Sequence, residues 1–187
     1  MGKDAFKSID YVEKHFKSKK KIPNNELALG YAILGDNYLS LKQFDLAISN
    51  YQKSVAIDNQ LKVQINLAKS LAFSSKYNES NEQYNRILIK TKVQSDLILI
   101  NEGLGDNYKN LKQYSKAIIY YQNALKLAEK AKLNTKITEL NTKIAANLSA
   151  MGVKNESDGY LQKSLYSAEN VPVETKIISQ NKVAEIY

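Results

Sequence analysis

Residues that could catalyse a reaction or bind a metal are scarce in this 187-residue chain. The chain has no cysteine and a single histidine, His15, so a cysteine–histidine pair is excluded, and no triad spacing surrounds the histidine. A metal site would need carboxylates alone, and the D-x-D-x-D-G run typical of a calcium loop does not occur. We therefore expect His15 to be an ordinary helix residue, and we predict a protein that is not an enzyme and has no metal or cofactor.

The charge balance raises the question of a nucleic-acid or membrane partner. There are 27 basic and 19 acidic residues, a formal charge of +8. Arg86 is the only arginine, whereas phosphate and guanine are best bound by the guanidinium group. The lysines are accounted for by AT-rich codons, and no apolar run is long enough for a membrane span or signal peptide. Nucleic acid and membrane are both disfavoured, and we expect a cytoplasmic location, with an extracytoplasmic fragment as the alternative.

A repeated string shows which elements must position any functional residue. LGDNYLSLKQF at 34–44 returns as LGDNYKNLKQY at 104–114, seventy residues later, which is two periods of 35. Weaker copies begin at Leu67 and Ile144, and a partial copy begins at Val183. A period of this length indicates a solenoid, in which stacked units bury faces that one unit cannot bury alone.

The apolar residues within each copy follow a helical period. Tyr31, Leu34 and Tyr38 share one helix face, and a second helix follows a short polar turn. We expect Gly35 to allow two backbones to approach closely, and Asp45 and Ser115 to cap the second helices of their units. The predicted helices span residues 4–19, 26–41, 45–57, 61–74, 78–91, 95–111, 115–131, 135–150, 156–168 and 174–187.

These residues resemble the tetratricopeptide repeat (TPR), a unit of about 34 residues with the pattern W-x2-L-G-x2-Y, A-x3-F and Pro. The first and third copies match closely, although the Trp and the closing Pro are missing, and the second and fourth are degenerate. The matching residues are Tyr31, Leu34, Gly35, Tyr38, Ala47 and Tyr51, then Asn101, Leu104, Gly105, Tyr108, Ala117, Tyr121 and Ala124.

The resemblance implies an all-α fold, a right-handed α-solenoid of TPR helix-turn-helix repeats, with about four repeats and flanking helices. We expect one domain over residues 1–187, and a chain that is a piece of a longer protein. Its parts are an N-terminal helix at 4–19, repeats at 28–61, 61–94, 98–131 and 138–171, and a partial fifth repeat at 174–187.

In TPR proteins the first helices of the units line a concave groove, and this resemblance gives the candidate ligand-binding residues. Ala32 and Asp36 stand where chaperone-binding members carry the Lys and Asn of a carboxylate clamp, so binding of a chaperone tail is disfavoured. The candidates are Leu29, Asp36, Leu39, Lys62, Ile65, Lys69, Phe73, Glu102, Asp106 and Lys109.

Asp36 and Asp106 are acidic residues at equivalent places in a basic chain, and helix packing is not expected to require them. In one interpretation they attract, with Glu102, a basic or amine-bearing peptide. In the other they are solvated residues paired with Lys69 or Lys109 on neighbouring helices. The sequence leaves both open.

Three classes of function follow from these observations. The leading prediction is a protein- or peptide-binding scaffold, the sensory or docking segment of a larger bacterial signalling or regulatory protein. The alternative is a self-associating assembly factor that forms homo-oligomers through the open ends of the solenoid. An enzyme fragment or nucleic-acid binder is disfavoured by the missing catalytic residues and the single arginine.

Overall fold

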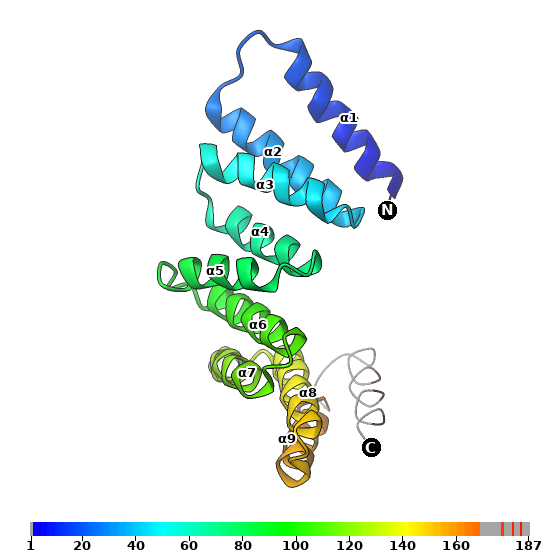
Figure 1. Ribbon diagram of the computed structural model, residues 1–187, viewed down its shortest axis with the longest axis vertical. Coiled ribbons are helices and arrows are strands. Elements are labelled where there is room, and N and C mark those ends of the chain that lie inside the picture. The colour runs from blue at the N-terminus through cyan, green and yellow to red at the C-terminus, as the bar shows by residue number, and fades with distance from the viewer. Residues whose placement is uncertain (1, 169–176, 178–180, 182–183, 185–187) are drawn as a thin grey trace. The chain divides into compact units, whose positions relative to one another are not determined.

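The chain forms a series of antiparallel helices in the computed structural model, which describes residues 2–168, 177, 181 and 184 (Figure 1). In this part of the chain each helix begins and ends within three residues of the bounds predicted from the sequence. The last predicted helix, 174–187, lies largely outside the described residues. The helices are α1 (Gly2–Ser18), α2 (Asn24–Ser40), α3 (Phe44–Ile57), α4 (Leu61–Phe73), α5 (Tyr77–Leu88), α6 (Gln94–Asn110), α7 (Tyr114–Lys130), α8 (Asn134–Ala150) and α9 (Lys154–Ala168).

The contacts group the chain into two compact units, Met1–Ile89 and Lys90–Tyr187. In the first unit α1 packs on α2, α2 on α3, α3 on α4, and α4 on α5. Ile9 and Val12 of α1 bury their side chains against Leu34 of α2. A second cluster joins α3 and α4, and its buried residues are Ala47, Ile48, Tyr51, Val63, Leu67 and Leu71.

The second unit repeats this arrangement with α6, α7, α8 and α9, each packed on the next. Its core joins α6, α7 and α8 and consists of Ile98, Ala117, Tyr121, Ala124, Leu125, Ala128, Leu140, Ile144 and Leu148. Of the residues expected to share the inward face of α2, Leu34 is buried, and Tyr31 and Tyr38 are partly buried against the same cluster. The expectation of one domain over residues 1–187 stays a prediction.

Two glycines of the repeated string are required by side-chain packing. A Cβ atom on Gly35 would lie 2.5 Å from Cε1 of Tyr51, and one on Gly105 would lie 2.5 Å from Cε1 of Tyr121. The neighbour of each glycine is thus a tyrosine ring of the second helix in the same repeat. The expectation of close backbone approach was wrong in this detail, because the ring occupies the space.

The turns between α2 and α3 and between α6 and α7 each contain a residue in the left-handed conformation, and no side chain caps the helix that follows. Lys42 and Lys112 end α2 and α6 with φ of 58°, and the following helices begin after Gln43 and Gln113 without a cap hydrogen bond from the side chain. The predicted caps at Asp45 and Ser115 were wrong, because both residues lie inside the first turn of a helix that starts one residue earlier than expected.

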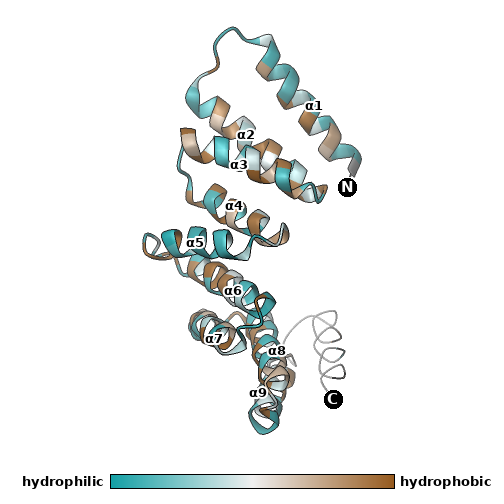
Figure 2. Cartoon of the chain, in the orientation of Figure 1, coloured by the Kyte–Doolittle hydropathy of each residue, from teal (hydrophilic) through white to brown (hydrophobic). Residues whose placement is uncertain are grey.

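Hydrophilic and hydrophobic residues are mixed along every described helix (Figure 2). Among those residues no helix is long and apolar enough to cross a membrane.

Candidate functional site

The ten candidate groove residues lie on α2, α4 and α6, the first helices of their repeats. Leu29, Asp36, Lys62, Phe73 and Lys109 are exposed, and Leu39, Lys69, Glu102 and Asp106 are partly buried. Ile65 is only 5% exposed, so its side chain belongs to the packing of α4 and offers little surface to a ligand.

Asp36 joins three helices of the first unit. Its Oδ1 accepts a hydrogen bond from the hydroxyl of Tyr51 on α3 at 2.6 Å and from Nδ2 of Asn66 on α4 at 3.1 Å. Burial raises the pKa of Tyr51, and the bond to Asp36 raises it further, so the hydroxyl remains protonated and donates. The bond to Asn66 also shows that the α2 and α4 faces meet at this carboxylate.

Asp106 repeats the arrangement in the second unit. Its Oδ1 accepts from the hydroxyl of Tyr121 on α7 at 2.7 Å, and Nζ of Lys143 on α8 donates to Oδ1 at 2.8 Å and to Oδ2 at 2.9 Å. Asn66 and Lys143 occupy the same register, because each precedes the leading apolar residue of the next repeat.

Asp36 and Asp106 therefore have a structural role that was not predicted from the sequence. Each carboxylate accepts a hydrogen bond from a nearly fully buried tyrosine that follows it by fifteen residues. The expectation that packing does not require these aspartates was wrong. The proposed pairing with Lys69 or Lys109 was wrong as well, because the cross-helix partners of the two carboxylates are Asn66 and Lys143.

Glu102 is the centre of an ion-pair network between α6 and α8. Nζ of Lys143 lies 2.8 Å from Oε1 of Glu102, Nζ of Lys136 lies 3.0 Å from Oε2, and Lys136 also pairs with Glu139. Burial opposes the negative charge of Glu102, but the two ammonium groups outweigh burial and lower the pKa of this carboxyl below its usual value. Burial likewise opposes the charge of Lys143, and Asp106 and Glu102 outweigh it and raise the pKa of this amine.

The two units consequently differ in how the charges on the first helices of their repeats are neutralised. In the second unit the negative charges of Glu102 and Asp106 are neutralised by Lys136 and Lys143. In the first unit Asp36 accepts hydrogen bonds from two neutral groups and forms no ion pair with any of the described residues. An attraction for a cationic ligand is therefore better supported at Asp36 than at Asp106.

Large apolar side chains remain exposed on the same helices of the first unit. Leu29 on α2 is 57% exposed, and Phe73 on α4 is 59% exposed. The ring of Phe73 stacks on that of Phe44 with centroids 5.5 Å apart, which holds its orientation. Leu29, Asp36 and Phe73 together offer apolar contacts and one negative charge.

No group of three or more His, Cys, Asp or Glu residues in the described part of the chain could hold a metal ion. His15 lies at the end of α1, with Nε2 3.4 Å from Oε2 of Glu26. This places the histidine beside a carboxylate that already binds Lys19.

Comparison with known proteins supports the fold. A tetratricopeptide-repeat sequence pattern matches residues 28–61 and 100–130. No curated protein sequence matches the chain.

Several solved structures are similar over most of the chain. A MamA protein has a TM-score of 0.73 and 20% identity, with 89% of this chain and 84% of that one covered. The apo form of RapI has a TM-score of 0.76 and 16% identity, covering 98% and 74%. BtubC from P. vanneervenii has a TM-score of 0.76 and 12% identity, covering 100% and 81%.

The sequence match covers the two copies in which the repeated string is best preserved, and the structural similarity extends over the degenerate copies. The resemblance stated from the sequence and the all-α fold class are both confirmed. Residues 28–61 and 100–130 therefore match tetratricopeptide repeats, and the chain has an all-α fold similar to those of the MamA and RapI structures.

Proposed function

We propose that the chain binds a peptide or protein segment along the exposed faces of α2 and α4, as a docking segment of a larger bacterial signalling or regulatory protein. The observation that carries the proposal is the exposure of Leu29 and Phe73, at 57% and 59%, on helices whose other faces already pack against neighbours. Large apolar side chains exposed on two adjacent helices are typical of a surface that binds a partner.

The polar groups on these helices define the ligand further. Asp36 is not neutralised by a cationic side chain among the described residues, and Lys62 is exposed one repeat later. A segment with apolar side chains and a basic residue opposite Asp36 is complementary to this surface. Charge complementarity of this kind determines orientation and specificity more than it determines affinity.

Selection of peptides from a displayed random library against the intact chain tests the proposal, followed by calorimetry with one selected peptide. Leu29→Ser and Phe73→Ser should each weaken binding by at least tenfold, because large anchors account for most of the affinity of such interfaces. The matched control is Leu46→Ser, because Leu46 is 48% exposed on α3, the second helix of the same repeat. Equal affinities of all three variants would contradict the proposal.

A second candidate function is self-association, favoured by the outer face of α1. This helix packs on α2 through Ile9 and Val12, while Phe6 and Tyr11 remain 57% and 73% exposed. Mass measurement by light scattering over a range of concentrations distinguishes the two functions. A dimer that dissociates in Phe6→Ser and Tyr11→Ser would support self-association, and a constant monomer mass would exclude it.

A further inference from the structure

The outer face of α1 carries a row of exposed lysines. They follow one another at spacings of four, seven and three residues, which places them on one side of the helix. The opposite side packs on α2 through Ile9 and Val12. This lysine row consists of Lys3, Lys7, Lys14 and Lys17.

The segment that contains the lysine row holds half of the net charge of the chain. Residues 2–21 contain seven lysines and three acidic residues, so they contribute +4 to the formal charge of +8. Lys14 pairs with Asp10 at 2.7 Å, but the two side chains are 74% and 62% exposed, so this ion pair is weak. The other three lysines of the row form no ion pair or cation–π contact with any described residue. Their charges are therefore available to a partner.

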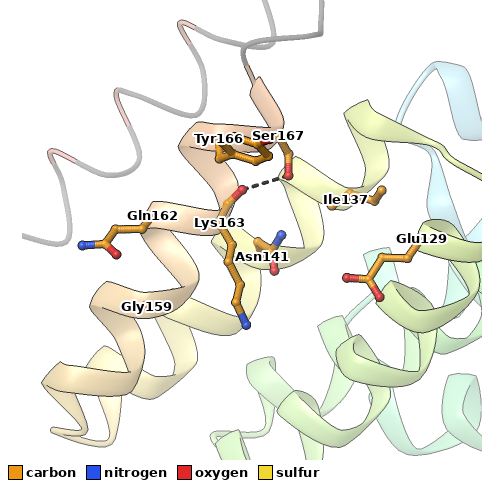
Figure 3. Close-up of a pocket in the computed structure, with 8 residues that line it drawn as sticks. All are labelled: Glu129, Ile137, Asn141, Gly159, Gln162, Lys163, Tyr166 and Ser167. Atoms are coloured by element: carbon orange, nitrogen blue, oxygen red, sulfur yellow. Dashed lines mark hydrogen bonds between the residues drawn. The ribbon is translucent and has the colours of Figure 1, made fainter.

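Several lysines of the second unit, by contrast, are engaged within the chain. Lys136 and Lys143 both pair with Glu102. Lys163 lines a pocket between α7, α8 and α9 (Figure 3), and its Nζ lies 4.9 Å from the ring centroid of Tyr160. These amines stabilise the fold, whereas the lysine row has no such role in the packing of α1.

Two aromatic side chains flank the lysine row. Phe6 follows Lys3 by three residues and is 57% exposed, and Tyr11 precedes Lys14 by three residues and is 73% exposed. Aromatic rings are favoured at the boundary between water and lipid, and lysine stems cover apolar surface while their ammonium groups stay in water. Lysines and exposed aromatic rings on one face are typical of a helix that lies on a membrane surface.

We propose that α1 binds the surface of a membrane that contains anionic lipids. The lysine row faces the phosphate-bearing headgroups, and Phe6 and Tyr11 enter the interface beside them. The row is complementary in charge to such a surface, and the attraction extends over about 10 Å at 0.1 M salt. A membrane was disfavoured because no apolar run is long enough to span one, but a helix that lies on the surface needs no such run.

Two other partners fit this face less well. Nucleic acid is best bound by arginine, whereas the lysine row contains none and Arg86 lies on α5 beside Glu82. A second copy of α1 would bring two lysine rows together, and repulsion between like charges opposes that contact. Peptide binding at Leu29 and Phe73 uses α2 and α4, so the two proposals can fail independently.

Sedimentation of the intact chain with lipid vesicles tests the proposal. The probe is vesicles of equal parts phosphatidylcholine and phosphatidylglycerol, and vesicles of phosphatidylcholine alone are the comparison. We expect binding to the anionic vesicles, weakened at least about tenfold as salt rises from about 0.05 M to about 0.5 M, because salt screens the lysine charges. Equal binding to the two kinds of vesicle, or binding to neither, would overturn the proposal.

Two triple variants with the same change in charge locate the contact. Loss of three lysines from the row should weaken vesicle binding at least about tenfold, and loss of three exposed lysines from the second unit should weaken it no more than about twofold. Circular dichroism confirms that both variants keep their helix content. Equal losses in the two variants would contradict the proposal. The row variant is Lys3→Gln, Lys7→Gln and Lys17→Gln, and the control is Lys126→Gln, Lys130→Gln and Lys154→Gln.

Phe6→Ser and Tyr11→Ser keep the charge of α1 and distinguish a membrane from other partners. Each should weaken vesicle binding several-fold, because an apolar contact with the interface is lost. Unchanged binding in both variants would overturn the proposal, as would binding to a short DNA duplex that is as tight as binding to the vesicles at the same salt concentration. A dimer that forms without vesicles and dissociates in Phe6→Ser would assign this face to a second copy and would also overturn it.

Discussion

The hydroxyl of Tyr51 donates a hydrogen bond of 2.6 Å to Oδ1 of Asp36, which connects the two helices of the first repeat. Tyr51→Phe should lower the free energy of unfolding by about 1.5 to 3 kcal/mol, because the donor bonds a charged acceptor. Asp36→Asn should cost less, since the amide oxygen can still accept. Urea denaturation followed by circular dichroism measures both. An unchanged midpoint in Tyr51→Phe would contradict this assignment.

The Asp36→Asn variant also separates structure from recognition. It removes the charge that we propose attracts a basic residue and keeps a hydrogen-bond acceptor for Tyr51. We expect the affinity for a selected basic peptide to fall several-fold, and the loss to shrink as salt rises. Asp106→Asn is the control, because Asp106 is already paired with Lys143. A smaller effect at Asp36 than at Asp106, measured by calorimetry, would contradict the charge assignment.

The helices and their order could be predicted from the sequence because apolar residues recur with a helical period in every copy. The role of Asp36 and Asp106 could not be read from that period, since it depends on a tyrosine of another helix. A signal was nevertheless present. The tyrosine follows fifteen residues after each aspartate, whereas in the fourth repeat Ala146 and Leu161 stand at these two places and neither carries a polar group.

The ion-pair network was missed for a related reason. Lys143 reaches Glu102 because the first helices of successive repeats lie side by side, and the register of that contact depends on units stretched toward 40 residues.

Replacing Gly35 and Gly159 by alanine should change the stability of the protein in opposite directions. Gly35→Ala places a Cβ atom 2.5 Å from the Tyr51 ring, so we expect a loss of stability of about 1 to 3 kcal/mol despite the better helix propensity of alanine. A Cβ atom on Gly159 would meet no atom of the described residues within 4 Å, so Gly159→Ala should stabilise the protein by about 0.5 to 1 kcal/mol. Thermal unfolding of the pair measures the difference. The same sign for both substitutions would contradict the packing described.

The ion-pair network of the second unit makes the free energy of unfolding depend on pH. The pKa of Glu102 in the folded protein lies below its usual value of 4.5, so its contribution is present above that value and is lost as pH falls through the folded pKa. Glu102→Gln should cost about 1 to 3 kcal/mol near neutral pH and less below about pH 4. Glu82→Gln is the control, because Glu82 is 70% exposed and lies 3.9 Å from Arg86. Equal pH profiles for the two variants would exclude the network's contribution.

The left-handed turn residues offer a stabilising substitution. Lys112 has φ of 58°, a conformation that glycine adopts without strain, so Lys112→Gly should raise the free energy of unfolding by up to about 1 kcal/mol. Lys126→Gly, within α7, should lower it by about 1 kcal/mol. Chemical denaturation of both variants checks the signs, and a destabilised Lys112→Gly would show that the lysine side chain contributes at the turn.

The most direct test of the account is chemical-shift mapping of a selected peptide on the isotopically labelled chain. The proposed surface predicts that the amide resonances with the largest shifts belong to α2 and α4, around Leu29, Asp36 and Phe73. The amide resonances around Leu46 and Ser49 on α3 should not shift. If the largest shifts fall on α3, or on α1 around Phe6 and Tyr11, the exposed faces of α2 and α4 are not the binding surface, and the central claim is wrong.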